Sequence, residues 1–138
     1  MHARLAATAT RRRLAALVLG LVVGLAPLPL LAQGLQIPTP SAGLMPNPTA
    51  GKPLYERHCA SCHGAELAGT ADKGPPLVHR VYEPSHHGDA AFQLAVRNGT
   101  RAHHWKFGDM APLPDLTPDE VAHITAHVRM MQRKAGIQ

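Results

Sequence analysis

Apolar residues recur at helical spacing most clearly in the last part of the chain. Val121, Ile124, Val128 and Met131 follow one another at intervals that place them on one face of a helix. The sequence Thr117-Pro118-Asp119-Glu120 precedes them and has the pattern of a capping box, with proline at the first helical position. The pattern predicts a C-terminal helix, and the basic residues that gather toward its end suit the helix dipole: Arg129, Arg133 and Lys134.

Two further helices are predicted from weaker patterns. One runs from about Asp89, the expected N-cap, to Asn98-Gly99. The other runs from about Ala50 into the cysteine motif described below, with Leu54 and Tyr55 as its apolar members. The sequence shows no alternating strand pattern and no hairpin signal. The predicted fold class is therefore all-α, with three main helices and long loops.

The first 32 residues have the pattern of a secretory signal. Four arginines and no acidic residue precede an apolar stretch at about 14–26, and a proline-bearing segment then ends at Ala32. We expect cleavage near Ala32 and export to the periplasm; the alternative is an uncleaved membrane anchor, although the apolar stretch is short for a bilayer. Residues 33–49 are rich in proline and predict a linker or a disordered tail. Residues 50–138 remain as the folded domain.

The signal also carries much of the positive charge. The whole chain has a formal net charge of +5 and a pI of about 9.8. Four of the 14 Lys and Arg residues, but none of the nine Asp and Glu residues, lie before residue 33. The remainder has a net charge of only +1, which gives no basis for a nucleic-acid partner.

Both cysteines lie in one short motif, Cys59-Ala60-Ser61-Cys62-His63. The C-x-x-C-H spacing is that of covalent c-type haem attachment, in which two thiols bond to the porphyrin and the histidine ligates iron. A redox dithiol and half of a zinc site are the alternatives. The first is expected near a βαβ pattern and the second needs another cysteine pair, and the sequence has neither. The motif predicts one covalent haem c, attached through Cys59 and Cys62, with His63 as an iron ligand.

With these elements in place, the sequence resembles the class I cytochrome c family over about residues 50–136. In that family an N-terminal helix crosses a C-terminal helix at a glycine and at an aromatic residue four positions later, which Gly51 and Tyr55 match. Ile124 matches the aliphatic contact, whereas His127 stands where the family usually has Tyr or Phe. The resemblance implies the class I cytochrome c fold wrapped around one haem, with an imidazole in place of the usual aromatic partner.

The resemblance also implies roles for residues around the haem. The segment Gly74-Pro75-Pro76-Leu77 matches the family's proximal segment, in which a proline carbonyl accepts the Nδ1 proton of the ligating histidine. That carbonyl is expected to belong to Pro75, with Leu77 beside the haem. Trp105 resembles the indole that donates to a haem propionate in small bacterial members, and a buried indole N–H needs such a partner.

Met110 is the expected sixth ligand of the iron. It lies in a loop before the last predicted helix, whereas Met1 belongs to the signal, Met45 to the linker, and Met130 and Met131 to the helix. In the family the methionine ligand lies on such a proline-stiffened loop. A methionine that merely packs on the core and a bis-histidine iron remain alternatives.

Loop histidines are the feature that the resemblance does not explain. Five of them could gather around a second metal ion such as copper or zinc: His79, His86, His87, His103 and His104. Adjacent loop histidines are more often surface residues, and neighbouring side chains rarely both point inward. The spacing alone therefore leaves a second metal site open.

The predicted ligand pair decides the expected function. A haem with His and Met ligands has no open coordination position, and the thioether favours ferrous iron. We predict an exported monohaem electron carrier rather than an enzyme, with redox proteins as partners and membrane contact only if the N-terminal segment is uncleaved. The alternatives are a cytochrome subunit of a larger oxidoreductase complex and, in a different class, a haem- or copper-binding sensor or metal-handling protein.

Overall fold

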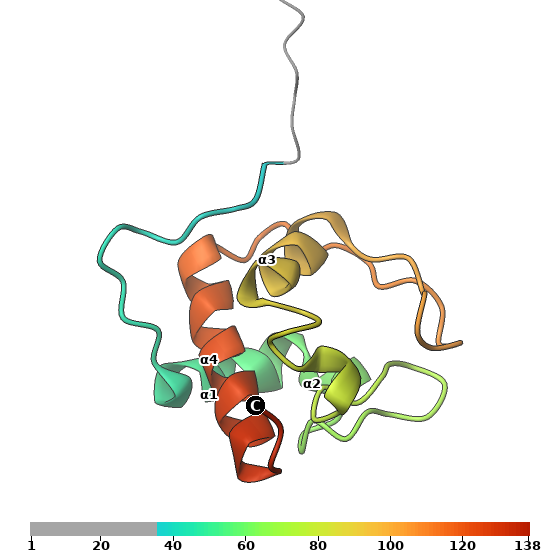
Figure 1. Cartoon of the computed structure of the whole chain (residues 1–138). Coiled ribbons are helices and arrows are strands. Elements are labelled where there is room, and N and C mark those ends of the chain that lie inside the picture. The colour runs from blue at the N-terminus through green and yellow to red at the C-terminus, as the bar shows by residue number, and fades with distance from the viewer. Residues whose placement is uncertain (1–35) are drawn as a thin grey trace, which may run out of the picture. The chain divides into compact units, whose positions relative to one another are not determined.

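The computed structural model describes residues 36–138, which form a helical domain (Figure 1). Its elements in chain order are α1 (Pro48–His58), α2 (Ala60–His63), the 3-10 turn η1 (Arg80–Tyr82), α3 (Asp89–Asn98) and α4 (Pro118–Lys134). Two isolated β-bridges occur in this described part of the chain, but no strand does, so the all-α prediction is confirmed. No helix within it has the length and apolar character needed to cross a membrane. The predicted signal lies outside the described residues.

The first and last helices cross at close range, as α1 and α4 do in Figure 1. Gly51 allows this approach, because a Cβ atom at that position would lie 1.9 Å from the backbone oxygen of His123. One turn later the ring of Tyr55 packs against the imidazole of His127, with ring centroids 5.6 Å apart and planes tilted by 50°. An imidazole thus takes the place of the usual aromatic partner, and the crossing of the helices is retained.

Residues 36–47 form no regular element, but hydrogen bonds hold part of this segment against the start of α4. The backbone N–H and the hydroxyl of Ser41 donate to the carboxylate of Asp119, at 2.7 and 2.8 Å, and lower the pKa of that carboxyl. The N–H of Asn47 donates to Nδ1 of His123 at 2.9 Å. The Asn47 side chain then caps the first turn of α1, which begins two residues before the expected start.

Arg129 on α4 is buried and joins three segments, a role that the sequence pattern did not indicate. Its guanidinium donates to the carboxylate of Asp89 at 2.8 Å, to the carbonyl of Tyr82 at 2.6 Å, and to the carbonyl of His87. The prediction of Asp89 as the N-cap of α3 is wrong, because Gly88 occupies that position and the Asp89 side chain accepts from Arg129 instead. A planar group with five donors suits such a junction.

The core between these elements contains few side chains. Its buried members come from α1, from α4 and from the loop between α2 and η1: Tyr55, Leu67, Leu77, Ile124 and Val128. The carbonyl of Leu67 accepts hydrogen bonds from the N–H groups of Leu77 and Val78, at 2.8 and 3.1 Å, and so closes that loop. A domain of this size is marginally stable on its own core, so a bound apolar group would add substantially to it.

Candidate functional site

The cysteine motif lies on a tight turn between two helices. The N–H of Cys59 donates to the carbonyl of Tyr55 at 2.8 Å as α1 ends, and the N–H of His63 donates to the carbonyl of Cys59 at 2.9 Å as α2 closes. Residues three and four positions apart lie on the same face of a helix, so the side chains of Cys62 and His63 lie on the same side of this turn as that of Cys59. Both cysteines are free thiols, Cys59 half-buried and Cys62 exposed. The turn thus presents two thiols and an imidazole close together.

The chain itself fixes the tautomer of His63. Its Nδ1 lies 2.9 Å from the carbonyl oxygen of Pro75, which can only accept, so Nδ1 carries the proton and Nε2 keeps a free lone pair. Burial lowers the pKa of this imidazole, and the Pro75 hydrogen bond opposes part of that shift. Gly74 lets the segment approach, because a Cβ atom there would lie 2.8 Å from the backbone oxygen of Cys62. A neutral imidazole with its proton fixed in this way is the form that ligates metals.

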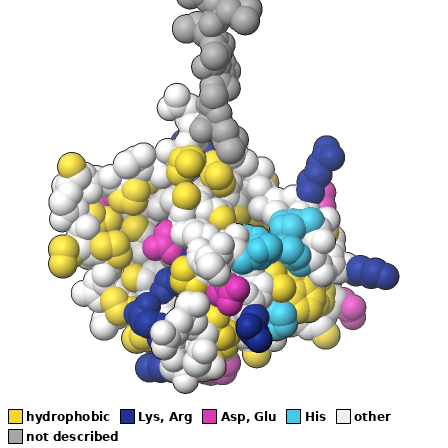
Figure 2. Space-filling view, in the orientation of Figure 1, with side chains coloured by type: hydrophobic (Ala, Val, Ile, Leu, Met, Phe, Trp, Pro, Cys, Tyr) yellow, Lys and Arg dark blue, Asp and Glu magenta, His cyan; other side chains and the backbone are white. Residues whose placement is uncertain are grey.

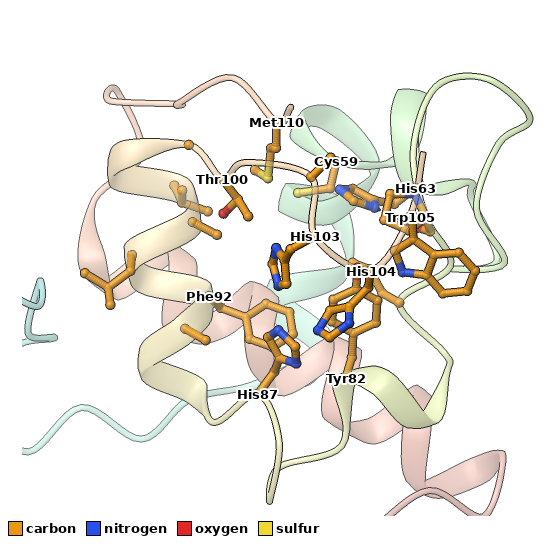
Figure 3. A pocket seen from close by; sticks show the side chains of 18 of the residues that line it. Cys59, His63, Tyr82, His87, Phe92, Thr100, His103, His104, Trp105 and Met110 are labelled. Atoms are coloured by element: carbon orange, nitrogen blue, oxygen red, sulfur yellow. Dashed lines mark hydrogen bonds between the residues drawn. The ribbon is translucent and has the colours of Figure 1, made fainter. Parts of the chain in front are cut away.

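A cavity of about 350 Å³ opens beside this imidazole (Figure 3). Side chains from α3, α4 and the surrounding loops form its mainly apolar wall. Cofactor sites are typically apolar cavities of about 300–1,000 Å³ with a few polar groups. Every predicted site residue except Cys62 lines it: Cys59, His63, Pro75, Leu77, Trp105 and Met110. The cavity therefore brings together residues from four separate parts of the sequence and suits a large apolar group.

Met110 reaches the cavity from the loop between α3 and α4 (Figure 3). An antiparallel bridge joins it to Thr100 at the beginning of this loop. Three residues after Met110, the N–H of Leu113 donates to the carbonyl of Val96 on α3 at 2.7 Å. The loop is thus closed at the methionine by its pairing with Thr100 and tied to α3 three residues later, so the thioether is presented from a fixed backbone.

Trp105 carries a buried donor without an acceptor. Its indole Nε1 has no hydrogen-bond partner among the atoms of residues 36–138. The hydroxyl of Tyr82 lies nearby but does not form a hydrogen bond with the indole N–H. Burial raises the pKa of that hydroxyl, and the neighbouring indole reduces the rise. An unpaired buried donor costs about 1–3 kcal/mol, so this N–H calls for an acceptor within the cavity. A carboxylate on a bound cofactor fits that requirement.

Four of the five loop histidines lie together at the cavity. His87, His103 and His104 line it, and His86 packs against His87 and His104, with ring centroids 4.6 and 5.2 Å apart. Both His103 and His104 are exposed side chains that border this cavity, which agrees with the expectation that adjacent loop histidines lie at the surface. His79 lies apart from them and packs edge-on against the ring of Trp105, with centroids 5.0 Å apart.

Comparison with known proteins gives one finding. A protein-family model described as cytochrome c matches residues 48–132, a range that contains the cysteine motif, the Pro75 segment, Trp105 and Met110. No curated protein and no solved structure matches the chain.

Proposed function

The chain belongs to the class I c-type cytochrome family, because the family match spans more than half of it, and from this premise we propose an exported monohaem electron carrier. Members of the family bind haem c covalently and transfer electrons. The haem would supply an iron that accepts and releases one electron. We assign its two axial ligands to His63 and Met110 and its thioether bonds to Cys59 and Cys62.

The observation that carries the ligand assignment is the hydrogen bond between His63 and Pro75. The Nδ1 atom of His63 lies 2.9 Å from the carbonyl oxygen of Pro75 and donates its proton to it. Nε2 is therefore the one nitrogen available to a metal. An imidazole oriented by a fixed acceptor keeps its position when the charge of the iron changes, which favours rapid electron exchange. Met110 lines the same cavity, and its bridged backbone supports it as the second ligand.

The state of the cysteines also supports thioether attachment over a redox dithiol. Burial, together with the neighbouring Cys62, raises the pKa of the Cys59 thiol to about 11. Redox-active dithiols have the opposite property, since their attacking cysteine has a lowered pKa and is present as a thiolate. In the proposed function these thiols serve as attachment points, and His63 follows them directly on α2.

The remaining wall of the cavity supports electron transfer without substrate binding. The Trp105 N–H would donate to a haem propionate, which satisfies its buried donor. Leu77 belongs to the buried core beside the cavity and would exclude water from the proximal side. Because both axial positions are filled by side chains, small molecules would have no place to bind on the iron. Redox proteins are the proposed partners, and the signal pattern in residues 1–32 supports export.

Absorption spectra of the purified mature protein test this proposal. We expect the reduced form to show the sharp bands of a six-coordinate low-spin haem, and the oxidised form to show the weak near-red band of methionine bound to ferric iron. A low-spin oxidised form without that band would indicate bis-histidine ligation. A high-spin spectrum would indicate an open site and would contradict the carrier function.

A further inference from the structure

Three histidines outside the proposed haem ligands bring their ring nitrogens together. The ligating atoms offered by His86, His87 and His104 all lie within 4.8 Å of one another. Histidine side chains form a patch on the face of the domain seen in Figure 2, and His87 and His104 lie close together in Figure 3. We propose that these three imidazoles bind one divalent transition-metal ion, Zn²⁺ or Cu²⁺, for which imidazole is a preferred ligand.

The separation of His86 and His104 suits a shared ion. Their Nε2 atoms lie 3.2 Å apart. Two nitrogens that each lie about 2.0–2.1 Å from a tetrahedral zinc ion are about 3.3–3.4 Å from each other. Without an ion, one of these rings must donate its Nε2 proton to the other. A metal ion would replace that proton and accept both lone pairs with little movement of either ring.

His87 is prepared for the same ion by its backbone contacts. Its Nδ1 lies 2.6 Å from the carbonyl oxygen of Val81, so Nδ1 holds the proton and Nε2 is free. Metal-ligating histidines usually donate their second nitrogen to such an acceptor, which orients the ring. The buried Arg129 also donates to the carbonyl of His87 and so ties the backbone of this residue to α4. The position of the ring is therefore set by the fold.

A fourth imidazole, that of His103, borders the cluster. His103 packs on His104 with ring centroids 4.3 Å apart, while its own Nδ1 lies 2.8 Å from the carbonyl oxygen of Arg101. With three protein ligands, a tetrahedral ion would keep one position for water or an external ligand.

Isothermal titration of the purified haem-loaded protein with zinc chloride tests the site. We expect saturable binding of one Zn²⁺ per chain. His86→Gln combined with His104→Gln should weaken that binding at least about tenfold, since the loss of even a supporting contact to a metal ligand has such an effect. Both side chains are exposed, so the fold should tolerate the change, and an unaltered midpoint of thermal unfolding would show that it does. The matched control is His58→Gln, at the end of α1 and outside the cluster, which should bind zinc as the unaltered protein does.

Electron paramagnetic resonance with copper sulfate gives an independent readout. One Cu²⁺ per chain should show hyperfine coupling to several nitrogens in the unaltered protein and should lose it in the double variant. The proposal is overturned if the unaltered protein takes up no zinc at millimolar concentration, or if the double variant binds zinc as tightly as the unaltered protein. The absorption spectra report on the ligands of the haem iron, whereas the zinc titration reports on the histidine cluster, so failure of the carrier function and failure of the metal site are distinguishable.

Discussion

Met110 and Thr100 are paired through two backbone hydrogen bonds, from the Met110 N–H to the Thr100 carbonyl at 2.8 Å and from the Thr100 N–H to the Met110 carbonyl at 3.0 Å. The pair joins the proposed methionine ligand to the residue that follows Gly99, where α3 ends. A loop closed by such a pair loses much of its conformational entropy before any iron is bound. The position of the thioether therefore depends on the end of α3 as well as on Met110 itself.

Met110→Ala tests the ligand directly. The haem should stay attached but become high-spin, bind carbon monoxide when reduced and have a lower reduction potential, because the thioether stabilises ferrous iron. Capture of the vacant position by His103 or His104 would restore a low-spin spectrum but would still lower the potential. Met45→Ala, at a side chain that is 85% exposed, is the control and should change neither property. A Met110→Ala protein with an unchanged spectrum and potential would show that another residue is the ligand.

Gly99→Ala should disturb the same ligand without touching it. A Cβ atom at Gly99 would lie 2.5 Å from the carbonyl oxygen of Met110, and the backbone there has φ of 73°. We expect a weaker near-red methionine band and a lower midpoint of thermal unfolding. Gly136→Ala is the matched control, since it also has a positive φ, of 77°, but no described atom lies within 4 Å of its Cβ position, and it lies outside the cavity. Equal loss of the band in both variants would assign the effect to backbone strain alone.

The thioether bonds of Cys59 and Cys62 are testable by mass spectrometry. The mature protein should retain the mass of one haem under acidic, denaturing conditions, because covalent attachment survives unfolding. Replacement of both cysteines by alanine should prevent stable folding, since the small core would lose its central group. Release of free haem together with a mass that indicates a disulfide would contradict the assignment.

Gly51→Ala should weaken the crossing of α1 and α4. The added Cβ would lie 1.9 Å from a backbone oxygen, which can move away only if the helices separate. We expect the free energy of unfolding to fall by about 1–3 kcal/mol, the usual effect of overpacking, measured by guanidinium denaturation. Gly88→Ala is the control, because its Cβ would make an ordinary contact at 3.7 Å and should change stability much less. If Gly51→Ala and Gly88→Ala lowered the free energy of unfolding equally, the crossing of α1 and α4 would not depend on the small size of Gly51.

His127→Phe should reduce the dependence of stability on pH. His127 is buried, and the Nδ1 atom has no partner among the described residues. Burial lowers the pKa of its imidazole; Lys52 and Lys134 lower it further, while Glu56 raises it. As the pH falls below about 6.5, the unfolded chain binds a proton at this residue before the folded protein does, so stability is lost in that range.

Phenylalanine cannot take up this proton. The free energy of unfolding of His127→Phe should therefore decrease less than that of the unaltered protein between about pH 7 and about pH 5. At neutral pH the variant should be at least as stable, because it removes an unsatisfied buried nitrogen and keeps a ring against Tyr55. Parallel pH profiles of denaturant unfolding for the two proteins would contradict a role of His127 in the acid sensitivity of the fold.

Features determined by neighbouring residues could be predicted from the sequence alone. The capping box at Thr117 and Glu120 is present, and α4 begins at Pro118 as expected. α3 ends at Asn98, before a glycine that adopts the positive φ its sequence position indicates. The spacing of Cys59, Cys62 and His63 requires only one helical turn to bring these side chains together. In each case the determining interaction joins residues no more than four positions apart, so the local sequence contains all of it.

Only the tertiary structure decided which distant segments meet. Ser41 binds Asp119 across 78 positions of the chain, although its segment alone has the composition of a free linker. In the sequence, Arg129 looks like an ordinary basic residue near the end of a helix. In the fold it is buried, because α3 and the loop that precedes α3 pack over its side chain and supply a carboxylate and carbonyl acceptors. His86 and His104 lie 18 positions apart, and their ring nitrogens approach only because the segment between η1 and α3 borders the same cavity as the Met110 loop. Such contacts depend on the path of the whole chain around its core, which no local pattern of residues specifies.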